Sequence, residues 1–127
     1  MKTLLSLALI AASVAAGPAL AECTYPKKGD KLVVIPDGNV AQLPEMLAAA
    51  RALKEFDVAI KAYGACLIDE ANAFRAANPG ITPEQNKELT DRLNGKLDAS
   101  DKELLELADL VNTQIRVYND KEKNAKK

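Results

Sequence analysis

Residues 78–85 read NPGITPEQ, and they lie between two long stretches that contain no proline. The first three of these residues are typical of a helix end, because proline cannot continue a helix and glycine favours its termination. Thr82 and Gln85 form a capping-box pattern, in which each side chain bonds the backbone amide of the other, with Pro83 in the first turn. The segment therefore predicts the end of one helix and the start of a second.

The two helices are expected at about 44–77 and 83–120, where apolar residues recur at intervals of three and four. A connection of about five residues turns the second helix back along the first. When the helices are aligned around that connection, Ala49 opposes Val111, a small side chain against a larger one. The predicted fold class is all-α, an antiparallel, coiled-coil-like two-helix hairpin.

One alternative concerns the second helix, which could be split near residues 95–100. Gly95 is a weak helix former, and Ser100 begins a second capping-box pattern that ends at Glu103. Three leucines nevertheless keep the apolar stripe in phase across this region: Leu93, Leu97 and Leu104. The sequence leaves both arrangements open and favours the continuous helix.

Residues 1–21 have the features of a secretory signal peptide. Lys2 precedes an apolar run at 4–16, and Ala19-Leu20-Ala21 has the small-x-small pattern of a cleavage site. The run is shorter than the roughly 20 residues that cross a bilayer, so a retained anchor is the weaker reading. Lipidation of Cys23 is disfavoured by the carboxylate of the preceding Glu22. We expect a bacterial protein that is periplasmic or secreted, with no transmembrane segment in the mature chain.

Cys23 and Cys66 are the two cysteines of the chain, and an oxidising compartment favours a disulfide between them. An intermolecular bond or two free thiols are the alternatives. Residues 22–43 contain turn signals and a short apolar run, which predict an extended N-terminal arm. The disulfide would staple this arm to the first helix, with residues 32–35 covering apolar surface. The expected docking site is a row of small residues: Ala52, Ala59, Cys66 and Ala73.

The composition excludes several classes of function. The chain has 17 basic and 18 acidic residues and a net charge of −1, which does not suggest nucleic acid as a partner. It contains no histidine, so the commonest general base and the commonest zinc ligand are missing. No phosphate-binding, calcium-binding or nucleophile-elbow motif is present. We therefore predict no catalytic residues, no cofactor and no metal site.

Glu70 is the most conspicuous carboxylate, because it interrupts the apolar seam of the first helix. A buried unpaired charge is costly, so Glu70 should either meet a cation across the hairpin or lie at a wet end. The candidate cations are Lys87, Arg92 and Lys96. An enzyme or redox accessory protein that uses Cys66 or Glu70 is the alternative function.

The leading hypothesis is a non-enzymatic protein-binding, scaffold or inhibitor module. The apolar stripe of the second helix is wider than one partner helix covers, and Ala108 and Ile115 lie on one flank of it. These two residues form a possible partner face for another protein or for a second copy in a homodimer. Residues 120–127 are rich in lysine and are expected to form a frayed end. Association of this tail with a membrane surface is a further alternative.

Overall fold

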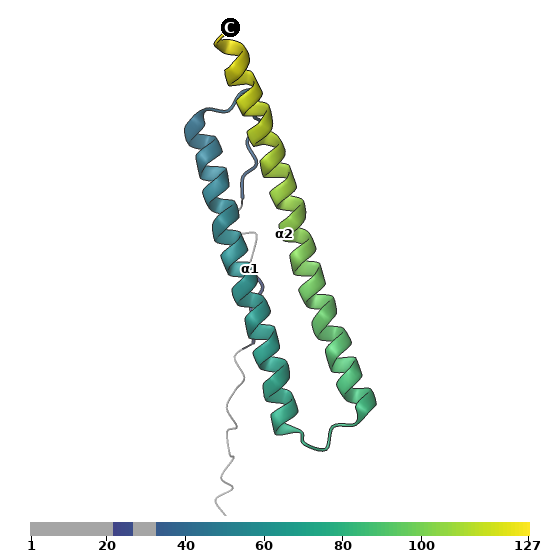
Figure 1. Cartoon of the computed structure of the whole chain (residues 1–127). Coiled ribbons are helices and arrows are strands. Elements are labelled where there is room, and N and C mark those ends of the chain that lie inside the picture. Colours follow the sequence, from purple (N-terminus) through teal and green to yellow (C-terminus); the bar gives the residue numbers. More distant parts are fainter. Residues whose placement is uncertain (1–21, 27–32) are drawn as a thin grey trace, which may run out of the picture.

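The computed structural model describes residues 22–26 and 33–127, and its two helices form an antiparallel hairpin (Figure 1). Helix α1 spans Leu43–Ala77 and helix α2 spans Pro83–Ala125, and the two pack against each other along their length. The predicted all-α hairpin is confirmed. The signal peptide expected at residues 1–21 lies outside the described residues, so cleavage and export stay predictions.

Capping interactions define where the helices begin. At the start of α2, the backbone N–H of Thr82 donates to the side-chain oxygen of Gln85 at 3.0 Å. In return, the N–H of Gln85 donates to the Thr82 hydroxyl at 3.2 Å, which is the capping box that the sequence indicates. At the start of α1, the N–H of Gln42 donates to a carboxylate oxygen of Glu45 at 2.7 Å. These contacts satisfy amides that have no partner within the helix.

Helix α2 is continuous, so the split that the sequence left open near Gly95 does not occur. Ser100 is buried, and its hydroxyl donates to the carbonyl of Leu97 at 2.8 Å. Because this hydroxyl bonds back to the preceding turn, it does not cap a new helix start. The helix also continues to Ala125, beyond the end expected near residue 120. The expectation of a frayed end from Asp120 is therefore wrong for these residues.

The predicted disulfide joins Cys23 of the arm to Cys66 of α1, with a Cα–Cα distance of 5.7 Å. Next to it, the ring of Tyr25 packs edge-on against Tyr63, with ring centroids 5.1 Å apart. The Tyr25 hydroxyl donates a hydrogen bond to the carboxylate of Glu103 on α2. The arm is thus attached to both helices at the middle of the hairpin.

Residues 33–41 of the arm lie between the helices near their free ends (Figure 1). Val33 lies in a buried cluster with Ala49 of α1 and Val111 of α2, and their exposed fractions are 8%, 4% and 0%. Ala49 and Val111 are the pair that the sequence alignment of the helices placed opposite each other. The arm therefore contacts α2 as well as α1, on which the small-residue row was the expected docking site. Leu32, expected to cover apolar surface, lies outside the described residues.

The turn at the end of the arm docks on the last turns of α2. The N–H of Gly38 donates to the side-chain oxygen of Gln114 at 2.8 Å. The ammonium of Lys121 donates to the carbonyl of Ala41 at 2.9 Å and lies 4.8 Å from the ring centre of Tyr118. These contacts hold the C-terminal part of α2 in place, which explains why it continues as a helix beyond residue 120.

Candidate functional site

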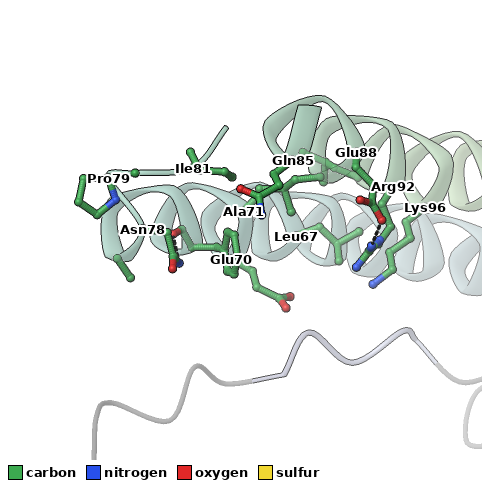
Figure 2. A pocket seen from close by; sticks show the side chains of 15 residues that line it. Leu67, Glu70, Ala71, Asn78, Pro79, Ile81, Gln85, Glu88, Arg92 and Lys96 are labelled. Atoms are coloured by element: carbon green, nitrogen blue, oxygen red, sulfur yellow. Dashed lines mark hydrogen bonds and ion pairs between the residues drawn. The ribbon is translucent and has the colours of Figure 1, made fainter. Parts of the chain in front are cut away.

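The arm covers only one half of the hairpin. We call the helix segments from the disulfide to the free ends the arm-covered half, and residues 67–96, which include the connection, the loop half. Since the arm runs from Cys66 away from the connection, the described part of it does not cover the loop half. The structure has a groove of about 710 Å³ there, which is the candidate site (Figure 2).

The floor of this groove is apolar. Leu67 and Ala71 of α1 are each 5% exposed and form its deepest part on that helix. Phe74 lies about one turn beyond Ala71 and is 44% exposed. Leu89 and Leu93 line the opposite wall from α2, and Ile81 closes the end at the connection. An apolar surface of this kind gains free energy when another apolar group covers it.

Charged side chains form the rim. Glu70 extends from α1, and Glu88, Arg92 and Lys96 extend from α2. Arg92 donates to a carboxylate oxygen of Glu88 at 2.8 Å, one turn away on the same helix. Figure 2 shows Glu70, Arg92 and Lys96 extending toward the same side of the hairpin. Among the residues that the structure describes, neither Glu70 nor Lys96 makes an ion pair.

Glu70 therefore lies at the edge of an open groove. The sequence offered two outcomes for this carboxylate, a cation across the hairpin or a wet end, and the structure shows the second. Lys96 and Arg92 line the same groove but do not form ion pairs with Glu70. Lys87 instead pairs with Asp91 on its own helix at 2.6 Å. The position of Glu70 explains why a charge is tolerated in the seam, since water reaches it.

Arg75 links the two helices outside the groove. Its guanidinium donates to the side chains of Asn86 at 2.8 Å and Thr90 at 2.9 Å, both on α2. A third bond reaches Asn72 on its own helix at 3.2 Å. Planar guanidinium groups with several bonds are rigid connectors, so these contacts fix the spacing of the helices beside the groove.

The half of the molecule that holds the arm contains the other sequence-predicted residues. Cys66 is bonded to Cys23, and no free cysteine is present in the described part of the chain, so the oxidised protein offers no thiol for a redox role. Burial, followed by the hydrogen bond to Glu103, raises the pKa of Tyr25 to about 12. The disulfide and the hydrogen bond from Tyr25 to Glu103 hold the arm in its position.

Ala108 and Ile115, the possible partner face, are both partly buried. Ile115 packs against the cluster of Val33, Ala49 and Val111. The turn of the arm lies against Val117, on the other flank of α2, where an added Cβ on Gly38 would come within 3.0 Å of the Val117 side chain. The face with Ala108 and Ile115 therefore lies beside the core to which Val33 of the arm belongs, on the flank of α2 opposite Val117. Its role in association stays a prediction.

The sequence analysis named Glu70, Arg92 and Lys96 but did not bring them together as the rim of a groove. The sequence feature that could have predicted the groove is the cysteine pair, because the disulfide decides which part of the helices the arm covers. Once Cys23 is fixed to Cys66, residues 33–41 lie toward the free ends, and no described residue of the arm forms a third layer over the last three turns of α1. The apolar stripe continues through those turns to Phe74, so its last part must meet solvent or a partner.

Two other features, a metal site and a membrane-spanning helix, concern the described residues as a whole. Within residues 22–26 and 33–127, no cysteine and carboxylate side chains gather in a group that could hold a metal ion. No helix in that part of the chain has the length and apolar character required to cross a bilayer. Comparisons with protein-family models, with characterised proteins and with solved structures find no match to this chain.

Proposed function

We propose that this protein is an exported, non-enzymatic binding module that takes a segment of another polypeptide into the groove of the loop half. The observation that carries the proposal is the unequal covering of the two helices. The arm buries the apolar stripe at one end, while the groove at the other end presents Leu67, Phe74 and Leu89 below a charged rim. Concave apolar surfaces with a few polar groups at their edge are typical of binding sites.

The disulfide supports the export part of this proposal, because it is compatible with an extracellular or periplasmic location. A bond that closes a loop with a sequence separation of 43 residues restricts the unfolded chain and favours the folded one. The signal peptide expected at residues 1–21 and its cleavage belong to the same proposal.

The binding proposal is tested by selecting peptides from a displayed random library on the full, disulfide-bonded protein. Selected peptides should lose binding to Phe74→Asp, because a carboxylate on the floor of the groove disfavours apolar contact. Leu105→Asp is the matched control, since Leu105 is also an exposed apolar residue but lies outside the groove. Circular dichroism should show equal helicity for both variants. Peptides that bind Phe74→Asp as tightly as the unmodified protein would contradict the proposal.

Self-association through Ala108 and Ile115 is a second candidate, suggested by an apolar stripe on α2 that is wider than one partner helix covers. Two hairpins joined there would form a four-helix bundle, and symmetric dimers are common among oligomers. Sedimentation equilibrium should then show a dimer that Ile115→Asp weakens without large loss of helicity. A monomer at high micromolar concentration would remove this candidate and leave the groove proposal unaffected.

A further inference from the structure

The arm shows what kind of segment these two helices accept between them. Residues 33–35 are extended, with Val33 turned into the core, Val34 68% exposed and Ile35 packed against the same cluster. This alternation of buried and exposed side chains is the pattern of an extended chain with one apolar edge. The hairpin therefore contains its own example of an extended segment held between the two helices.

An extended segment outside a sheet leaves its backbone amides and carbonyls without partners, and these groups need hydrogen bonds when they are covered. In the turn that follows residues 33–35, side chains of α2 supply two such bonds. The side-chain oxygen of Gln114 accepts from the N–H of Gly38, and the ammonium of Lys121 donates to the carbonyl of Ala41. A helical segment would satisfy its own backbone and would need no such groups.

The open groove repeats the site that holds Tyr25, one heptad nearer to the connection. Tyr63 and Glu103 contact Tyr25 from the two helices. Seven residues along α1 from Tyr63 is Glu70, and seven residues back along α2 from Glu103 is Lys96. Residues seven apart lie on the same face of a helix, so the groove continues the face along which the arm runs.

The polar groups in the repeated site are an acceptor on α1 and a donor on α2. Glu70 and Lys96 have no ion pair with any described residue, whereas Arg92 is already bonded to Glu88. Lys96 is suited to a carboxylate or a backbone carbonyl of an incoming segment, and Glu70 is suited to a backbone N–H. This is the same division of roles that Lys121 and Gln114 have in the arm-covered half.

We infer that the groove binds an extended segment of another polypeptide, with alternating apolar side chains and one acidic residue that meets Lys96. The inference rests on the proposed function and specifies its ligand. From Leu67 to Ala77 the helix rises about 15 Å, a distance that about five extended residues span. The partner segment would lie on the face that holds the arm, on the side of the disulfide nearer to the connection.

The inference is tested with three fluorescent synthetic peptides and the disulfide-bonded protein. The first is an extended peptide of about seven residues that alternates valine and threonine and ends in aspartate. The second replaces the aspartate with lysine. The third is an amphipathic helix stabilised by helix-favouring residues, with the same net charge as the first. Anisotropy measures the affinity of each.

The aspartate peptide should bind most tightly, and Lys96→Glu should weaken its binding by about three- to tenfold. Lys54→Glu makes the same charge change on an exposed residue of α1 outside the groove, and it should leave the affinity unchanged. Tighter binding of the helical peptide would overturn the inference while leaving a binding groove. Equal affinity of the lysine and aspartate peptides would remove the role of Lys96. Binding of none of the three would overturn the inference, and the library selection on Phe74→Asp would still decide the proposed function.

Discussion

The two halves of the hairpin are built from the same pair of helices with the same apolar repeat, yet they differ in how well that repeat is covered. In the arm-covered half, Ala49 and Val111 are 4% and 0% exposed beneath Val33. In the loop half, Phe74 lies on the same apolar stripe and is 44% exposed. The difference between the halves is the arm.

The comparison shows that two helices alone do not bury the width of their own apolar stripe. A third layer is required, as expected for domains that pack secondary structure around a core. Here the arm provides that layer over one half and the disulfide at Cys66 marks where the layer ends. The covered half supplies stability, and under the proposed function the loop half binds the partner.

Removing the disulfide should have the largest effect, because it releases the end of the arm nearest the groove. Cys66→Ser is expected to lower the free energy of unfolding by about 3 to 4 kcal/mol, given the length of the closed loop. Thermal denaturation followed by circular dichroism measures the loss. Cys23→Ser is the matched control and should give the same value. An unfolding free energy unchanged in both variants would show that the arm is held without the bond.

Trimming one apolar side chain in each half tests the comparison directly. Val111→Ala should cost about 2 to 3 kcal/mol, because a fully buried side chain loses its contacts and leaves a cavity. Phe74→Ala should cost less than about 1 kcal/mol, despite removing more atoms, since its ring already contacts water. Urea denaturation of both variants gives the values. Equal losses would mean that the loop half is covered as fully as the other.

Gly38→Ala should disturb the docking of the arm turn on α2. A Cβ at this position would meet the backbone carbonyl of Gln114 and lie 2.8 Å from the backbone nitrogen of Tyr118, so the turn must move. We expect a loss of about 1 to 2 kcal/mol, as for other overpacked contacts. Gly95→Ala is the control, because nothing lies within 4 Å of its added Cβ and alanine favours a helix. A stable Gly38→Ala variant would place the turn away from α2.

High pH should loosen the arm by a smaller amount. The pKa of Tyr25 is raised from its ordinary value of 10.0 to about 12, so the folded state binds this proton more tightly than the unfolded chain. The resulting stability is complete below about pH 10 and is lost as the pH rises toward 12. Tyrosinate absorbance should show one late-titrating tyrosine that Tyr25→Phe removes. If Tyr25→Phe instead removes a tyrosine signal that titrates near the ordinary pKa of 10.0, burial of the Tyr25 hydroxyl is contradicted.

The fold was predictable because each of its signals is local. The capping box at Thr82 and Gln85 marks a helix start, and the repeat that places Ala49 opposite Val111 sets the register. The two cysteines gave the disulfide because a single pair leaves one intramolecular choice. The continuity of α2 through Gly95 was less certain from the sequence, since the role of Ser100 depends on whether its hydroxyl faces back along the helix.

The groove was harder to predict, because it depends on what the arm does not reach. The sequence marks Glu70 as a break in the seam, but it does not show that Lys96 lies unpaired across the same opening. The particular contacts of the arm with α2 were also not predicted, since Tyr25 and Gly38 meet α2 residues about 80 positions away. Such contacts follow from the packing of the whole hairpin.

Chemical-shift mapping of the isotope-labelled, disulfide-bonded protein tests the central claim most directly. Peptides selected on the protein are added, and the backbone amide signals are followed residue by residue. If the loop half is the binding site, the largest changes will occur around Leu67, Phe74 and Lys96, while Val33 and Val111 stay unchanged. Changes that centre on Ala108 and Ile115, or on the arm, would contradict the claim that the uncovered half binds the partner.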